Sequence, residues 1–218
     1  MNIQRFIRNY PHLYHMAEAD TWESIRSNGL LSTAAILDYH SVESEVRPVY
    51  ESNHRLVMME VTSENHQTMI LRDQIPMPPN RMAQGLLNGI TPSEWYFFLN
   101  QKVFFWATKE RLLRLLNARH YRNVEHDVLT IETSSLIAGY LEQITICHMN
   151  SGNTFPMPHS RDYSIFKNIP DYPIKPNGSP LKEVAEVTVN YSVMDIQNHT
   201  VKVERMLGDV SLAVIYER

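Results

Sequence analysis

The stretch LYHMAEADTWESIRSNGLLS, residues 13–32, carries the strongest structural signals in the chain. A short apolar run ends in a histidine, His15, and Asp20 or Thr21 can then cap an acidic segment of about two helical turns. Gly29 follows where the end of a helix favours a positive φ. The pattern predicts a strand over residues 12–15 and a helix ending at Asn28, with the histidine at their junction.

Composition limits the kind of protein that this chain can be. Its 218 residues are 43% hydrophobic and 20% charged, which suits one domain with a core of normal size. The net charge of −4 disfavours a large phosphate-binding footprint. Cys147 is the only cysteine, so a reducing compartment is expected. No apolar run has the length of a membrane span or a secretion signal, so we expect a soluble cytoplasmic protein with no membrane partner.

The periodicity of the remaining sequence predicts an α+β fold with a mixed sheet. Strands are expected at residues 102–106, 128–132, 143–147, 184–189, 201–206 and 210–216. Helices are expected at residues 1–10, 30–37, 82–87, 91–96, 108–118 and 134–140. Residues 55–62 and 69–72 suit helix or strand equally, and residues 40–54 suit a loop or lid. We expect residues 1–218 to form a single domain in which residues 148–182 are a long loop insertion.

Several kinds of site have no support in the sequence. No HExxH, paired CxxC or carboxylate-rich calcium loop is present, so we expect no metal. The GxGxxG and phosphate-loop patterns of nucleotide sites are also absent. The lone Cys147 lies in an apolar strand, where a core position is more common than a nucleophile.

Three features remain as candidates for chemistry: His15, the aromatic strand KVFFW at residues 102–106, and Glu186 within VAEVTV. Burying a strand glutamate costs several kcal/mol or shifts its pKa. The alternative for Glu186 alone is an edge-strand residue facing water. A strand-end histidine is often only a satisfied, partly buried residue, and an aromatic strand is often core.

In this order the features resemble the ADP-ribosyltransferase fold. Ile25, Gly29, Leu30 and Leu31 match the helix and Gly-Leu-Leu segment that follow the strand histidine in DNA-modifying ADP-ribosyltransferase toxins, RNA 2′-phosphotransferases and poly-ADP-ribose-polymerase-like enzymes. Residues 180–206 resemble their glutamate-bearing strand and the segment after it. The resemblance implies a split mixed β-sheet with helices packed on it.

The resemblance also implies NAD+ as a co-substrate and assigns roles to residues. His15 would anchor the dinucleotide, with Met16 and Ala17 beside the nicotinamide. Phe105 or Trp106 would stack on the nicotinamide, although this strand has Phe-Phe-Trp where the polymerase group has a tyrosine and a small residue.

Glu186 is the implied catalytic residue. Cleavage of the nicotinamide–ribose bond develops positive charge at the anomeric carbon, which a fixed carboxylate can stabilise. Glu183 is the second choice for this role. The phosphates of NAD+ need a counter-charge, for which Arg47 and Arg72 are preferred over Arg55.

The front motif favours a nucleic-acid acceptor, RNA or single-stranded DNA. Arg119 and Tyr121 lie in a basic patch that contains an aromatic ring, and Asn150 and Arg161 lie in the long loop, so these residues are the candidates for acceptor binding. The leading hypothesis is a bacterial toxin of a toxin–antitoxin or phage-defence system, with an antitoxin protein as partner. Open alternatives are a protein-directed mono-ADP-ribosyltransferase, an RNA 2′-phosphotransferase and a non-catalytic nucleotide-binding member.

Overall fold

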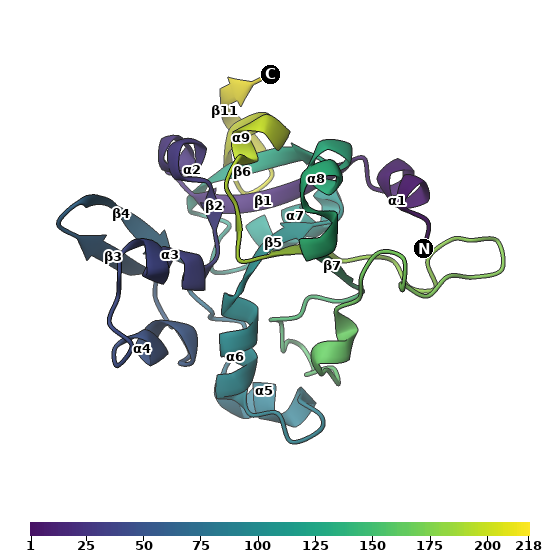
Figure 1. Cartoon of the computed structure of the whole chain (residues 1–218), viewed down its shortest axis with the longest axis horizontal. Coiled ribbons are helices and arrows are strands. Elements are labelled where there is room, and N and C mark those ends of the chain that lie inside the picture. Colours follow the sequence, from purple (N-terminus) through teal and green to yellow (C-terminus); the bar gives the residue numbers. More distant parts are fainter.

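The computed structural model describes residues 1–218 and is built on one seven-stranded sheet in the order β11-β10-β6-β1-β5-β8-β7 (Figure 1). The strands are β1 (His12–Glu18), β5 (Lys102–Trp106), β6 (Glu125–Glu132), β7 (Ile144–Cys147), β8 (Glu186–Asn190), β10 (Thr200–Leu207) and β11 (Val210–Glu217). The α+β class is as expected. Every neighbouring pair in this sheet is antiparallel, so the prediction of a mixed sheet is wrong. The helical connection from β5 to β6 does join parallel strands, but β1 lies between them and pairs antiparallel with both.

Two shorter sheets and the helices complete the fold. β2 (Leu30–Leu31) pairs with β9 (Ser192–Val193), and β3 (Met59–Ser63) forms a hairpin with β4 (His66–Leu71). The helices are α1 (Ile3–Asn9), α2 (Trp22–Asn28), α3 (Thr33–Tyr39), α4 (Arg47–Glu51), α5 (Pro79–Gly85), α6 (Pro92–Asn100), α7 (Lys109–Leu116), α8 (Thr133–Tyr140) and α9 (Ile196–His199), with 3-10 turns at Leu141–Gln143 and Tyr163–Ile165. None of the helices combines the length and the apolar character that crossing a membrane requires.

The opening stretch folds largely as its sequence predicts. β1 runs into α2, and Gly29 ends that helix with a φ of 85°. A Cβ on Gly29 would lie 2.8 Å from the backbone Cα of Met194, so both the conformation and the space require glycine. The predicted helix at residues 30–37 starts later than expected. Leu30 and Leu31 pair with β9 instead, and Ser32 caps α3 by accepting from the N–H of Ala35 at 3.2 Å.

The secondary structure of residues 40–54 differs from the predicted loop, and the structure decides between helix and strand for residues 55–62 and 69–72. The expected loop at residues 40–54 contains α4, which has a proline in its first turn. The ambiguous residues 55–72 contain the β3–β4 hairpin. This hairpin packs on α3 through a small core of its own, which includes Leu37, Val61 and Leu71.

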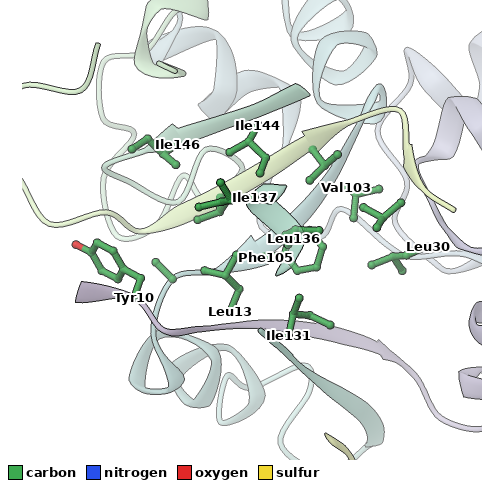
Figure 2. Close-up of a cluster of buried hydrophobic side chains, with 14 of the residues drawn as sticks. Tyr10, Leu13, Leu30, Val103, Phe105, Ile131, Leu136, Ile137, Ile144 and Ile146 are labelled. Carbon is green, nitrogen blue, oxygen red and sulfur yellow. The ribbon is translucent and has the colours of Figure 1, made fainter. Parts of the chain in front are cut away.

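The main core lies on one face of the large sheet. Leu13, Phe105 and Ile131 point into it together with side chains of α8 (Figure 2). Strand alternation places Tyr14 and Met16 on the opposite face, where they pack against α7. The sheet thus has α8 on one face and α7 on the other. Alternate residues of β1 pack toward these two faces in turn.

The sheet is weakest between its two central strands. β1 pairs with β6 at every residue from His12 to Glu18, but shares with β5 the single pair Tyr14↔Trp106. Beyond that pair, the C-terminal part of β1 and the N-terminal part of β5 diverge. The result is an opening in the sheet between these two strands.

Candidate functional site

A cleft of about 830 Å³ lies at the opening between β1 and β5. Its volume is in the range of about 300–1,000 Å³ that is typical of ligand sites. Its walls come from residues 15–21, the start of β2, residues 67–74, β5, residues 150–152 and Glu186. His15 and Glu186, from opposite ends of the chain, therefore border the same cavity.

His15 lines the opening directly after Tyr14, the last residue of β1 that pairs with β5. Its Nδ1 lies 2.8 Å from the carbonyl oxygen of Phe104 on β5. Because a carbonyl can only accept, Nδ1 carries the proton and Nε2 is left as an acceptor. Burial lowers the pKa of His15 to about 4, an effect that the bond to Phe104 opposes and the charge of Arg72 increases. The imidazole is therefore neutral at physiological pH and offers one acceptor nitrogen.

His15 and Glu186 start from opposite faces of the sheet. His15 alternates with Tyr14 and Met16, and Glu186 lies opposite Trp106 in the register of β5 and β8. In an unbroken sheet the two side chains would be separated by backbone. They line one cleft here because the divergence of β1 and β5 opens a passage through the sheet.

Glu186 is a buried carboxyl group at the start of β8, with 5% of its surface exposed. Both of its oxygens accept from the backbone N–H of Ser151, at 3.2 and 3.1 Å. Burial raises its pKa to about 7, against the opposing effects of the Ser151 bond and the nearby charges of Arg161 and Arg111. This group therefore changes charge near neutral pH.

Arg72 supplies a cation at the far end of the cleft, directly after β4. Its Nη1 lies 3.3 Å from Nδ1 of His126 and 3.6 Å from Oε2 of Glu18. Its guanidinium also lies 5.4 Å from the centre of the Tyr121 ring, whose hydroxyl donates to Asp73 at 2.8 Å. Oε2 of Glu18 and Nε2 of His126 are buried without a hydrogen-bond partner. The group is polar and incompletely satisfied, as ligand-binding sites often are.

All five residues of the aromatic strand border the cleft, but Phe105 also belongs to the main core. Phe105 is 1% exposed and packs in the main core, with its ring 5.8 Å from that of His15. It is therefore not free to stack on a ligand. Trp106 alternates to the other face and lines the cleft while half-buried. Met16 and Ala17 also line the cleft, as their place beside His15 predicted.

Three predicted binding arginines lie outside the cleft lining. Arg47 is held on α4 by Asp38 at 2.5 Å and Glu51 at 2.7 Å, so its charge is already neutralised. Arg119 is exposed on the turn after α7, although its neighbour Tyr121 does line the cleft. Arg161 is 1% exposed and binds backbone carbonyls, so it cannot contact an acceptor.

Asn150 lines the cleft but its amide oxygen is engaged. It accepts from the N–H groups of Gly152 at 3.1 Å and Asn153 at 2.9 Å. The N–H of Ser151 is taken by Glu186. The N–H groups of Ser151, Gly152 and Asn153 are therefore all engaged within the protein.

Glu18 lines the cleft although no sequence signal pointed to it, whereas His126, its neighbour on β6, is not among the lining residues. They are opposite each other in the register of β1 and β6. The sequence predicts a strand that ends at His15, whereas β1 continues to Glu18, which lines the cleft. No group of three or more His, Cys, Asp or Glu side chains is arranged to hold a metal ion.

A family model matches residues 11–200 of the chain, and its description is "Family of unknown function (DUF7002)". The matched region contains both His15 and Glu186. No curated protein matches the chain.

Proposed function

Since this chain belongs to the DUF7002 family, whose function is unknown, we propose from its cleft that it is an NAD+-dependent ADP-ribosyltransferase. The observation that carries the proposal is the position of His15 and Glu186 on one cleft of about 830 Å³. A neutral imidazole acceptor and a buried carboxyl group face the same space, as the resemblance of the first and last motifs to ADP-ribosyltransferases implies. In this proposal the break between β1 and β5 is the split in the sheet that the fold family has.

The residues present suit the dinucleotide. Nε2 of His15 accepts from a ribose hydroxyl, since its Nδ1 proton is already donated to Phe104. Arg72 meets the pyrophosphate, being the cleft arginine whose guanidinium is not saturated by carbonyls. Trp106, rather than Phe105, stacks on the nicotinamide, with Met16 and Ala17 beside it.

Glu186 acts at the reacting carbon of NAD+. In its ionised form it accepts a hydrogen bond from the ribose 2′-hydroxyl and stabilises the positive charge that develops at the anomeric carbon. The bond from that carbon to the nicotinamide nitrogen breaks, and nicotinamide leaves as a neutral molecule with the electron pair. An acceptor nucleophile forms the new bond to the same carbon and loses its proton to the Glu186 carboxylate or to water.

The acceptor is a nucleic acid in this proposal, RNA or single-stranded DNA. Tyr121 lies on the cleft wall, between the exposed cations Arg119 and Arg122 in the sequence. These two arginines provide phosphate contacts at the cleft margin. A transferase of this kind acts as a toxin, and an antitoxin protein is then needed to restrain it in the producing cell.

The test is transfer of label from NAD+ that is radiolabelled in its adenylate part. The wild-type protein is incubated with separate pools of RNA, single-stranded DNA and protein lysate. We expect label in a nucleic-acid pool, and a loss on the order of 1,000-fold with Glu186→Gln. Glu183→Gln is the matched control, because Glu183 is exposed and paired with Arg111 at 2.8 Å.

Other outcomes separate the alternatives. Label in the protein pool identifies a protein-directed transferase. NAD+ binding without transfer to any pool identifies a non-catalytic member. Wild-type transfer by the Glu186→Gln variant contradicts the assignment of the site.

A further inference from the structure

Arg161 is one of the most deeply buried cations in the molecule, with 1% of its surface exposed. Its guanidinium donates to three backbone carbonyls: Nη1 to Ser151 at 2.6 Å, Nη2 to Asn153 at 2.8 Å and Nε to His159 at 3.0 Å. No carboxylate pairs with it directly. A buried arginine that binds only carbonyls fixes the course of the chain around it.

Ser151 is the point at which this network meets the candidate site. Its carbonyl accepts from Arg161 and also from Nε1 of Trp95, a residue of α6, at 3.2 Å. Its N–H donates to both oxygens of Glu186. The N–H and the carbonyl of Ser151 belong to adjacent peptide planes that share one Cα, so the two donors to the carbonyl fix one plane and limit the positions that the other plane and its N–H can take.

We propose that Arg161 is a positioning residue for Glu186, which acts by holding Ser151 so that the Ser151 N–H binds and orients the carboxylate. The inference rests on the proposed function only in taking Glu186 as the reacting group. It explains why a polar loop segment far along the chain from α6 is fastened to that helix. It also gives a role to an arginine that its position in the loop had suggested for acceptor binding.

The loss of Arg161 has a predictable effect on the charge state of Glu186. The bond from Ser151 and the charge of Arg161 both favour the ionised carboxylate, and burial opposes it. The other charged group that acts on Glu186 is Arg111 of α7, while the neighbouring Cys147 is a neutral thiol whose pKa burial and Glu186 raise to about 12. Arg111 remains when Arg161 is changed, so the shift in Arg161→Met combines the loss of the Arg161 charge with the loss of its bond to Ser151, and a variant that keeps the charge is needed to isolate the Ser151 connection.

The experiment compares Arg161→Met with Arg81→Met by NMR titration of ¹³C-labelled glutamate carboxyl groups. Arg81 is the matched control because it fastens the same loop at Thr154 and Pro156 without touching Ser151. The Glu186 signal is identified by its absence in Glu186→Gln. We expect the titration midpoint of Glu186 to rise by about one pH unit in Arg161→Met and to stay unchanged in Arg81→Met.

A second variant protects the test against misfolding of Arg161→Met. Trp95→Phe removes one donor to the Ser151 carbonyl and keeps an aromatic ring in the core, so a smaller rise in the same direction is expected. The pH profile of transfer is then measured, and its acid limb is expected to move with the NMR midpoint. An unchanged midpoint in folded Trp95→Phe overturns the inference, because a shift confined to Arg161→Met is then accounted for by the lost charge alone. A shifted midpoint in a protein that transfers nothing retains the inference and contradicts the proposed function.

Discussion

Nδ1 of His15 lies 2.8 Å from the carbonyl oxygen of Phe104, and this contact bridges β1 and β5 where the two strands separate. A regular sheet would satisfy that carbonyl with a backbone N–H of the neighbouring strand. Here a side chain replaces the missing ladder bond. The imidazole therefore connects the two strands through a hydrogen bond and also lines the cleft.

Replacing His15 by alanine tests the second of these roles. We expect His15→Ala to weaken NAD+ binding about tenfold, because it removes the Nε2 acceptor from a buried site. His12→Ala is the control, since His12 lies on the same strand but is exposed at its start. Isothermal titration calorimetry measures both variants. Equal affinity of His15→Ala and wild type would remove His15 from the dinucleotide site.

The two groups that frame the cleft were visible in the sequence for local reasons. His15 ends an apolar run and Glu186 interrupts one. Each of these signals can be recognised from a few neighbouring residues. The same holds for Gly29, because its conformation depends on the helix directly before it. Such features need no knowledge of the partner strand.

The rest of the site depends on register and packing, which no short pattern contains. Glu18 meets Arg72 and His126 only because β1 pairs with β6 along its whole length and the β4 end folds against both. Arg47 and Arg161 looked like free loop cations. In the tertiary structure Asp38 and Glu51 neutralise Arg47, and loop carbonyls occupy the donors of Arg161.

The raised pKa of Glu186 has a consequence for stability as well as for chemistry. Because the folded state holds this proton more tightly than the unfolded chain, folding stability falls as the pH rises from the ordinary pKa of 4.5 to about 7. The difference corresponds to roughly 3 kcal/mol at high pH. We therefore expect Glu186→Gln to be more stable than wild type above pH 7 and close to it at pH 4.5. Urea unfolding across this pH range measures the effect, and a stability difference that does not vary with pH would contradict the buried, proton-retaining state.

Replacing Arg72 and replacing Arg47 should have different effects on NAD+ affinity, because only Arg72 lines the cleft. Arg72→Gln removes the cleft cation, so we expect NAD+ affinity to fall more than tenfold, since charge-assisted hydrogen bonds contribute about 1.5–3 kcal/mol. Arg47→Gln should leave that affinity unchanged and lower the melting temperature, because it breaks the contacts of α4 with Asp38 and Glu51. Binding and thermal unfolding are measured on both proteins. Weaker NAD+ binding by Arg47→Gln with normal binding by Arg72→Gln would reverse the assignment.

The exposed cations on either side of Tyr121, Arg119 and Arg122, should contribute to nucleic-acid binding but not to NAD+ cleavage. Arg119 and Arg122 lie outside the cleft lining, so the double change to glutamine should leave cleavage of NAD+ in the absence of acceptor unchanged. Binding of single-stranded RNA or DNA should weaken, and the dependence of log affinity on log salt should become shallower by about 0.7 for each phosphate that the variant no longer neutralises. Tyr121→Leu, which removes the aromatic ring from the cleft wall, should weaken binding with little change in that slope. Fluorescence anisotropy at several salt concentrations separates the two effects. If the double variant keeps the wild-type slope, the acceptor does not cross this patch, and a protein acceptor becomes the better explanation of the cleft.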